Sequence, residues 1–185
     1  MSEERYIEYI KNIKRYSIHT ITSYQTDIKQ FRNYVLAQYE IDELSLVSTE
    51  VIRSWVVYLM SLELSVRSIR RKISTIKSFY SFLVSQNTVE SNPVLRIPKL
   101  KSPERLVTFI EESKLQELSA ENELPDSFDK LRDYLIVLVL YATGIRRSEL
   151  VGLKESDVDL EGAELKVLGK RNKERIIPFS KSLGQ

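Results

Sequence analysis

The sequence contains no cysteine and a single histidine, His19. Without cysteine there is no disulfide framework and no thiolate metal site, which suits a reducing compartment. One histidine with no cluster of carboxylates or cysteines near it does not build a metal site either. We therefore expect a protein that holds no metal ion.

Long hydrophobic runs are also missing. The longest apolar stretch, residues 134–142, has nine residues, whereas a helix needs about 20 to cross a bilayer. The first residues, Met-Ser-Glu-Glu-Arg, are polar and contain no apolar signal region. We expect a cytoplasmic protein with no membrane segment, in which residues 134–142 lie in a buried core helix.

The net charge of +2 conceals a difference between the two halves of the 185-residue chain. Residues 1–101 hold 15 lysines and arginines against 10 acids, whereas residues 102–185 hold 13 against 16. The first half is therefore the better candidate for a polyanionic partner. The length and the 42% hydrophobic content allow one large or two small domains.

Proline marks a boundary between two domains. Three of the five prolines fall within eleven residues, at Pro93, Pro98 and Pro103. Proline lacks a backbone donor and biases its predecessor toward extended geometry, so we expect neither helix nor sheet here. The predicted organisation is an N-terminal domain over residues 1–86, an extended basic linker over 87–107 and a second domain over 108–185.

Four amphipathic helices are predicted before the linker, which makes a small all-α domain. Ser17, Thr49 and Ser65 are suitable N-caps for the second, third and fourth helices. The apolar faces consist of Tyr6, Ile10 and Ile13; Ile21, Tyr24, Ile28, Phe31 and Val35; Ile52, Trp55, Val56 and Leu59; and Ile69, Ile73, Ile76, Tyr80 and Leu83.

The fourth helix carries the clearest charge pattern, with five basic residues and no acid between positions 67 and 77. At helical spacing, one face combines cations with hydroxyls and lies opposite the isoleucines. Such a face suits contact with DNA phosphates, although solvated helix faces also carry lysine and arginine. Because this face lacks glutamate, we interpret it as a contact surface for double-stranded DNA. The predicted contacts are Arg67, Arg70, Arg71 and Lys77.

The start of the second helix, residues 17–24, groups small hydroxyl side chains around His19. This arrangement favours a capping or DNA-facing polar role for His19 over a catalytic one. Thr20 is the predicted DNA contact of this segment.

After the linker the pattern becomes mixed. Residues 109–120 predict an amphipathic helix, and residues 128–142 predict a buried helix that a Thr-Gly pair ends. Two short β-prone runs, 163–168 and 175–179, flank the turn Gly-Lys-Arg-Asn-Lys and predict an antiparallel hairpin. The expected fold class is mainly α, with a mixed α+β second part.

Two cationic residues of this second part are candidates for chemistry. Arg146 opens a helical turn after the Thr-Gly pair, and Lys170 lies at the tip of the hairpin. A buried arginine and a hairpin lysine are suited to gripping and protonating a phosphodiester. Each has an ordinary alternative: Arg146 could pair with Glu149 on its own helix, and Lys170 could bind a phosphate as a point charge. Arg147 must face elsewhere and is assigned no catalytic role.

These motifs resemble those of tyrosine recombinases. Residues 142–150, Ala-Thr-Gly-Ile-Arg-Arg-Ser-Glu-Leu, are similar to the first-arginine motif, and residues 169–178, Gly-Lys-Arg-Asn-Lys-Glu-Arg-Ile-Ile-Pro, to the hairpin of the catalytic lysine. Residues 17–24 with Asp27 and Phe31, residues 70–79 and the Asn92-Pro93 pair resemble the core-binding domain. Four motifs in the right order cover almost the whole chain and are most similar to Xer-type recombinases.

The resemblance implies a four-helix, SAM-like core-binding domain followed by the first part of a recombinase catalytic domain. In this family a tyrosine attacks the scissile phosphate, without metal or other cofactor, and leaves a 3′-phosphotyrosyl link and a free 5′-hydroxyl. Arg146 matches the first arginine that stabilises the phosphate oxygens, and Lys170 matches the lysine that protonates the departing oxygen. Arg171 and Lys173 are expected to bind DNA. The implied partners are double-stranded DNA and a recombinase tetramer on paired DNA sites.

The sequence departs from the family pattern after the hairpin. It contains no His-x-x-Arg motif, and all ten tyrosines lie at or before Tyr141. We therefore expect a truncated recombinase that binds DNA without cleaving it. The functions left open are chromosome dimer resolution of the Xer type, integration or inversion by a mobile element, and a DNA-binding module without catalysis. A helical interaction protein with no nucleic-acid partner leaves the basic face and the two motifs unexplained.

Overall fold

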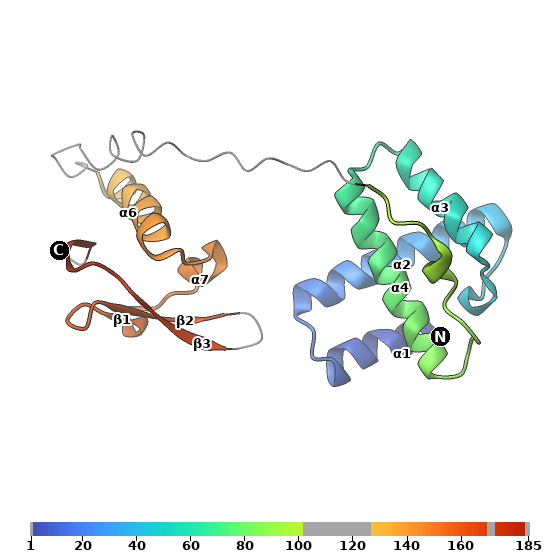
Figure 1. Cartoon of the computed structure of the whole chain (residues 1–185), viewed down its shortest axis with the longest axis horizontal. Helices are drawn as coiled ribbons and strands as arrows, with labels where there is room; N and C mark the ends of the chain where they lie inside the picture. The colour runs from blue at the N-terminus through green and yellow to red at the C-terminus, as the bar shows by residue number, and fades with distance from the viewer. Residues whose placement is uncertain (1, 102–126, 170–172, 184–185) are drawn as a thin grey trace. The chain divides into compact units, whose positions relative to one another are not determined.

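The computed structural model describes residues 2–101, 127–169 and 173–183. The chain divides into two compact units, residues 1–106 and residues 107–185, each of which has its own hydrophobic core. The first is helical and the second combines helices with a small sheet (Figure 1). The expected fold class, mainly α with a hairpin in the second part, is confirmed.

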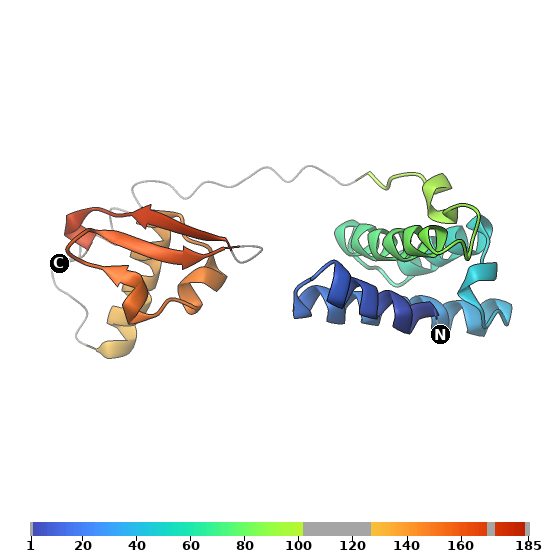
Figure 2. The same ribbon diagram turned by 90° about the horizontal axis from the view of Figure 1, so that it is seen from below.

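Residues 2–101 of the first unit contain four α-helices, as predicted. They are α1 (Ser2–Glu8), α2 (Ile18–Tyr39), α3 (Thr49–Ser61) and α4 (Val66–Ser85), with short turns η1 (Tyr9–Ile13), η2 (Leu44–Leu46) and η3 (Pro93–Arg96) between or after them. Figure 2 shows α1 and α2 in one layer and α3 and α4 in a second. Helix α4 packs against each of the other three helices, so it forms the centre of the unit.

Two of the three predicted helix caps are confirmed. The Ser17 hydroxyl accepts the Thr20 N–H at 3.4 Å, and the Ser65 hydroxyl accepts the Ser68 N–H at 3.2 Å. The prediction for α3 is wrong by one residue, because Ser48 is the N-cap. The Thr49 hydroxyl instead donates to the Pro93 carbonyl at 3.1 Å, which ties the residues after α4 to the start of α3.

The core of the first unit is rich in aromatic side chains. Its largest fully buried members are Trp55, Tyr6, Tyr80, Phe31 and Phe79. The buried phenols keep hydrogen-bond partners, since the hydroxyl of Tyr6 donates to Ser78 at 2.8 Å and that of Tyr80 to the Leu44 carbonyl at 2.7 Å. The prediction that Ile13 is a core residue is wrong, because its side chain is 70% exposed. Residues 9–13 form a π-helical turn, whose wider spacing shifts Ile13 away from the face that Tyr6 and Ile10 share.

The segment after α4 is not extended throughout, contrary to the prediction for the linker. Residues 93–96 form the turn η3, in which Pro93 occupies the first position, where a missing N–H is tolerated. The Asn92 side chain caps this turn by accepting the Val94 N–H at 3.0 Å, and it donates to Lys77 O and Ser81 Oγ. Val94 is buried, so the start of the predicted linker packs on the first unit.

The described part of the second unit joins two helices to a three-stranded sheet. Its described elements are α6 (Phe128–Thr143), α7 (Arg147–Val151), η4 (Glu155–Asp157), β1 (Val158–Asp159), β2 (Glu164–Leu168), β3 (Glu174–Pro178) and η5 (Lys181–Leu183). The strand order is β1-β2-β3 and both pairings are antiparallel. The predicted hairpin is confirmed, β1 was not predicted, and the predicted helix at 109–120 lies outside the described residues.

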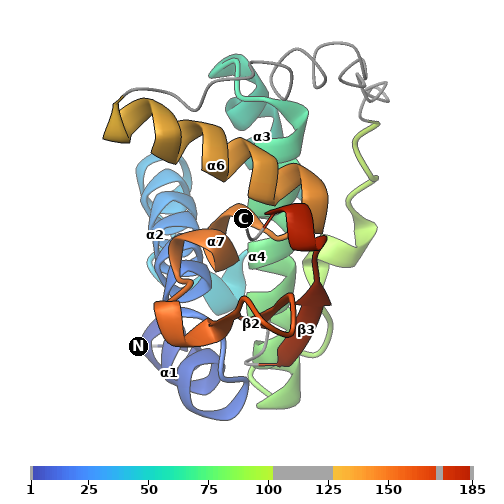
Figure 3. The same ribbon diagram turned by 90° about the vertical axis from the view of Figure 1, so that its left-hand side faces the viewer.

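Gly144 ends α6 and turns the chain toward the sheet. Its φ of +61° lies in the left-handed region that glycine adopts without strain, and its N–H bonds Leu140 O. The next side chain, Ile145, is buried with Leu165 and Val167 in the small core of this unit. Arg146 then caps α7, which lies between α6 on one side and β2 and β3 on the other (Figure 3).

The prediction that residues 128–142 form a buried helix is half right: the helix forms, but none of its side chains is buried. Val139 and Leu140 pack on the core of the second unit, while Phe128 is 78% exposed and Val137 is 42% exposed. A helix that is apolar all round needs neighbours on every side, and the described residues pack mainly on one.

Candidate functional site

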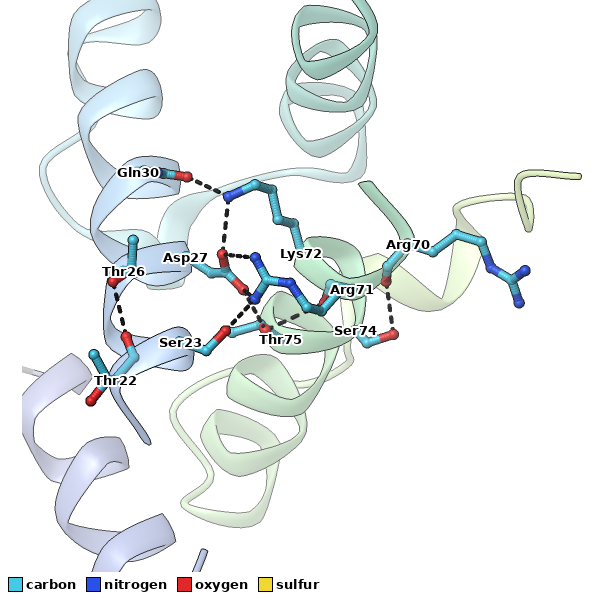
Figure 4. Close-up of polar contacts among 10 residues, drawn as sticks. All are labelled: Thr22, Ser23, Thr26, Asp27, Gln30, Arg70, Arg71, Lys72, Ser74 and Thr75. Atoms are coloured by element: carbon cyan, nitrogen blue, oxygen red, sulfur yellow. Dashed lines mark hydrogen bonds and ion pairs between the residues drawn. The ribbon is translucent and has the colours of Figure 1, made fainter. Parts of the chain in front are cut away.

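The basic face predicted on α4 is exposed along its length. Arg67, Arg70, Ser74, Lys77 and Ser81 all lie on the surface. The side chain of Arg70 extends away from α2, as Figure 4 shows. The structure therefore gathers on one exposed helix face the cations and hydroxyls that commonly contact DNA phosphates, and their role in DNA binding remains a prediction.

Arg71 points in a different direction from Arg70, toward α2 (Figure 4). Its guanidinium makes a bidentate ion pair with Asp27, with Nη1–Oδ2 at 2.5 Å and Nη2–Oδ1 at 2.9 Å. Nη1 also donates to the Ser23 hydroxyl. Arg71 therefore does not belong to the basic face formed by Arg67, Arg70 and Lys77, although 47% of its side chain is exposed.

The carboxylate of Asp27 is the centre of a polar cluster between α2 and α4. It is fully buried, and besides Arg71 it accepts from Lys72 Nζ at 3.0 Å and from the Thr75 hydroxyl at 2.9 Å. Lys72 is itself buried and also donates to Gln30 Oε1. Lys72 is therefore part of the interior of the unit, and not of the exposed face to which its charge alone would assign it.

Thr20 and His19 lie in the first turn of α2. The Thr20 hydroxyl is 3.0 Å from the Ser17 hydroxyl, so both contribute to the N-terminal cap. His19 is exposed. A DNA contact by Thr20 remains a prediction.

In the second unit, Arg146 and Glu149 are joined in two ways. The Glu149 carboxylate accepts the backbone N–H of Arg146 at 2.9 Å and its guanidinium Nη1 at 2.8 Å. The expectation of a buried arginine is wrong, because 63% of the Arg146 side chain is exposed. It is the carboxylate that is buried, with 3% of its side chain exposed. Arg146 therefore pairs with Glu149 and still keeps most of its side chain exposed.

Arg175, on β3, shares the same carboxylate. Its Nη1 and Nη2 lie 2.6 and 2.8 Å from the two oxygens of Glu149. Arg175 was not identified as a site residue from the sequence. It is 26 positions from Glu149, and an arginine in a β-strand is no signal of an ion pair with a helix. Only the hairpin register, which sets Arg175 opposite Val167, brings it to the helix.

Gly169 lies directly over this pair. A Cβ on Gly169 would be 3.1 Å from Arg175 Nη1 and 3.4 Å from Glu149 Oε1, so a side chain would press on the ion pair. The Gly169 N–H also donates to the Lys173 carbonyl at 2.7 Å and closes the hairpin. Lys170 and Arg171 lie outside the described residues, and the side chain of Lys173 is exposed.

The two arginines hold Glu149 as a carboxylate. Hydrogen bonds from Arg175 and then from Arg146 lower the pKa of Glu149 to about 2. The same bond to Glu149 raises the pKa of Arg175. At neutral pH the cluster therefore contains one negative and two positive groups and retains a net positive charge.

Within residues 2–101, 127–169 and 173–183, no group of three or more histidine, cysteine, aspartate or glutamate side chains is arranged to hold a metal ion. None of the helices in these ranges is long and apolar enough to cross a membrane.

Two family profiles match the chain in the order that the fold suggests. The phage integrase N-terminal SAM-like domain matches residues 4–87, and the phage integrase family matches residues 108–185. The chain belongs to the phage integrase family. The two matches correspond to the helical unit and to the unit that holds Arg146, and their junction falls within residues 88–107.

Curated members of this family resemble the chain along nearly all of its length. The tyrosine recombinase XerC of Staphylococcus saprophyticus is 40% identical over 179 residues, which are 96% of this chain and 59% of the relative. The tyrosine recombinase XerD of Rickettsia conorii is 39% identical over 180 residues, 94% of this chain and 58% of the relative. The chain thus spans less than two thirds of the length of these relatives.

A solved structure shows the same fold. A lambda integrase dimer bound to a COC′ core site is similar with a TM-score of 0.72 at 20% identity, over 96% of this chain and 58% of that chain. At this identity the similarity supports the shared integrase fold and not a shared target.

Proposed function

We propose that this chain is the DNA-binding domain and the first part of the catalytic domain of a Xer-type site-specific recombinase that resolves chromosome dimers. The observation that carries the proposal is the cluster of Arg146, Glu149 and Arg175 beneath Gly169. One carboxylate holds both Arg146, the N-cap of α7, and Arg175 on β3, the hairpin strand that follows Lys170 in the sequence. The first-arginine motif and the hairpin motif, which match the same phosphodiester chemistry, are thereby joined through Glu149.

The exposed guanidinium of Arg146 suits the stabilisation of a phosphate. Nη1 is anchored by Glu149, and the side chain is 63% exposed, so other N–H donors can reach the non-bridging oxygens. A donor fixed before the reaction stabilises charge that develops in the transition state at little reorganisation cost. As the tyrosine oxygen bonds to phosphorus and the bond to the 5′-oxygen breaks, Lys170 gives that oxygen a proton.

The nucleophile of this reaction matches no residue of the 185, since no tyrosine follows Tyr141. We propose that the chain by itself binds double-stranded DNA without cleaving it, and that the longer recombinase acts as a tetramer on paired sites. In the test, the 185-residue chain and the longer recombinase are incubated separately with a nicked duplex, and covalent protein–DNA adducts are detected on a denaturing gel. An adduct from the 185-residue chain would contradict this part of the proposal.

An integrase or invertase of a mobile element is the second candidate. Its architecture has the same order of domains, so the fold does not separate the two. The Xer assignment is favoured by relatives at 39–40% identity that are themselves tyrosine recombinases of the XerC and XerD types. A competition binding experiment would discriminate between the two candidate functions. It would compare how strongly the chain binds a chromosomal dimer-resolution site and a site from the end of a mobile element.

The exposed face of α4 is proposed to contact the DNA backbone. The test measures binding of a duplex by the chain at several salt concentrations. Replacing Arg67, Arg70 and Lys77 together with alanine should lower the log–log salt slope by about 0.9 for each phosphate that the variant no longer neutralises. A control with the same change in charge replaces exposed cations of other elements, Lys11, Arg53 and Lys130. Equal slopes for the two triple variants would mean that the α4 face is merely solvated.

A further inference from the structure

The guanidinium of Arg71 is held so that one edge is left for a ligand. Nη1 donates to Ser23 and to Asp27, and Nη2 donates once to Asp27. A guanidinium has five N–H groups, so the Nε–H and the second N–H of Nη2 remain. No hydrogen bond within the described part of the chain uses either of them. These two N–H groups are parallel, and together they form the edge that binds two acceptors at once.

Three exposed side chains of α2, those of Thr22, Thr26 and Gln30, are uncharged and suited to base edges. The hydroxyls of Thr22 and Thr26 donate to backbone carbonyls of their own helix at 3.0 and 2.9 Å, which leaves their oxygen lone pairs and methyl groups exposed. The Gln30 carbonyl accepts from Lys72, which leaves its amide N–H groups. In Figure 4, Gln30 lies beside Lys72 on the side of α2 that faces α4, whereas Thr22 and Thr26 lie farther from Arg71 around the same helix.

The charge of the cluster also favours DNA. One carboxylate, Asp27, faces two cations, Arg71 and Lys72. Lys72 is buried, so the positive charge in excess is available at the half-exposed Arg71. Because its guanidinium is already fixed in the free protein, little side-chain entropy is lost when it binds. Arg70, which extends into solvent, has no such restraint and suits a phosphate.

We propose that Arg71 recognises a guanine in the major groove, with its free edge donating to O6 and N7, and that Asp27 is the residue that positions it. This inference rests on the proposed binding of double-stranded DNA and adds a sequence preference to it. A bidentate arginine is the commonest specific contact to guanine, and it distinguishes that base from the other three.

The first measurement needs no variant. The 185-residue chain selects its preferred duplexes from a randomised pool, and each guanine in the selected sequence is then replaced singly. At one position, adenine should weaken binding by roughly 5- to 150-fold, and 7-deazaguanine, which lacks the N7 acceptor, should weaken it in the same direction. If no guanine shows this N7 dependence, the proposal is wrong.

The second measurement identifies the residue. Arg71→Lys keeps the charge and removes the two-donor edge, so binding should persist while the preference at that guanine disappears. Asp27→Asn keeps the shape and releases the guanidinium, and it should reduce the same preference. Arg70→Ala is the control, since it should weaken binding to all duplexes alike and leave the ratio unchanged. An Arg71→Lys protein that retains the guanine preference would overturn the assignment.

Folding of each variant is checked by the fluorescence of Trp55, which is the only tryptophan and is buried in the same unit. If Asp27→Asn unfolds, the Arg71→Lys protein and the modified duplexes still decide the question. Failure of the wild-type chain to bind any duplex would overturn the proposed DNA-binding function and this inference with it. Duplex binding without an Arg71-dependent guanine preference would overturn this inference alone.

Discussion

The two units of the molecule use the same device for different ends. In each, one buried carboxylate holds two cations. Asp27 holds Arg71 and Lys72, which are consecutive on α4, and Glu149 holds Arg146 at the start of α7 and Arg175 on β3. In each pair of cations, at least one guanidinium remains substantially exposed. A buried acid thus fixes a surface arginine, which is how a flexible side chain becomes a preorganised donor.

The surroundings of the two carboxylates differ. Asp27 is completely buried between α2 and α4, beside a large aromatic core. Glu149 lies in the second unit, whose buried core cluster among the described residues consists of Ile145, Leu165 and Val167. We infer that the first cluster is coupled mainly to folding and the second mainly to the position of the residues around it. Substitutions in each cluster test this difference.

The largest expected effect is on the stability of the first unit. Asp27→Ala leaves Lys72 buried without its carboxylate, and breaking a buried ion pair in this way costs about 3–5 kcal/mol. The free energy of unfolding is measured by urea titration followed by Trp55 fluorescence. Asp42→Ala is the control, because Asp42 pairs with Arg32 at the surface with 78% of its side chain exposed. Similar destabilisation of the two variants would contradict a folding role for Asp27.

The second prediction concerns catalysis in the longer recombinase. Arg146→Ala removes one preorganised donor, so the rate of DNA cleavage should fall by roughly 10²–10³. Duplex affinity should change little, because the proposed backbone contacts lie on α4. The adjacent Arg147→Ala is the matched control and should cleave normally. Near-normal cleavage by the Arg146→Ala enzyme would remove Arg146 from the catalytic role.

Local signals in the sequence predicted local structure well. Ser17 and Ser65 were recognised as caps because a hydroxyl before an apolar periodic run has few other roles. The hairpin was recognised from two β-prone runs around a turn rich in glycine and asparagine. Thr49 was predicted as the cap of α3, but the helix begins at Thr49 and its N-cap is Ser48, while the Thr49 hydroxyl is used in a contact with Pro93.

Contacts between distant residues were not predictable in this way. Asp27 and Arg71 are 44 positions apart, and nothing in either local pattern reveals their ion pair. Arg71 was therefore grouped with Arg70, its neighbour in the sequence, although the two side chains point apart. Arg175 was missed for the same reason. The prediction overestimated the burial of α6. An apolar run indicates that a helix favours burial, but it does not show which other residues of the fold pack against that helix.

The third prediction uses the low pKa of Glu149. Its value of about 2 in the folded chain lies below the usual value of about 4.3, so the interaction stabilises the fold fully above about pH 4.3. That contribution is lost as the pH falls from there toward 2. The urea midpoint of the second unit, followed by the NMR signals of Val167, should drop over this range. In Glu149→Gln the midpoint should be lower at pH 6 and should depend less on pH. The same pH dependence in both proteins would show that other carboxylates are responsible.

The smallest expected effect separates the two cations at Asp27. Arg71→Ala should cost only about 0–1 kcal/mol of unfolding free energy, because 47% of the side chain is exposed and exposed ion pairs contribute little. Asp27 keeps its bonds to Lys72 and Thr75, so no buried charge is left unpaired. Lys72→Ala, at the same carboxylate but with a buried cation, should cost more when measured by the same Trp55 titration. If Arg71→Ala lowered the free energy of unfolding as much as Asp27→Ala does, Arg71 would be a structural residue of the α2–α4 interface. Its stability effect would then argue against a role of its exposed edge in binding.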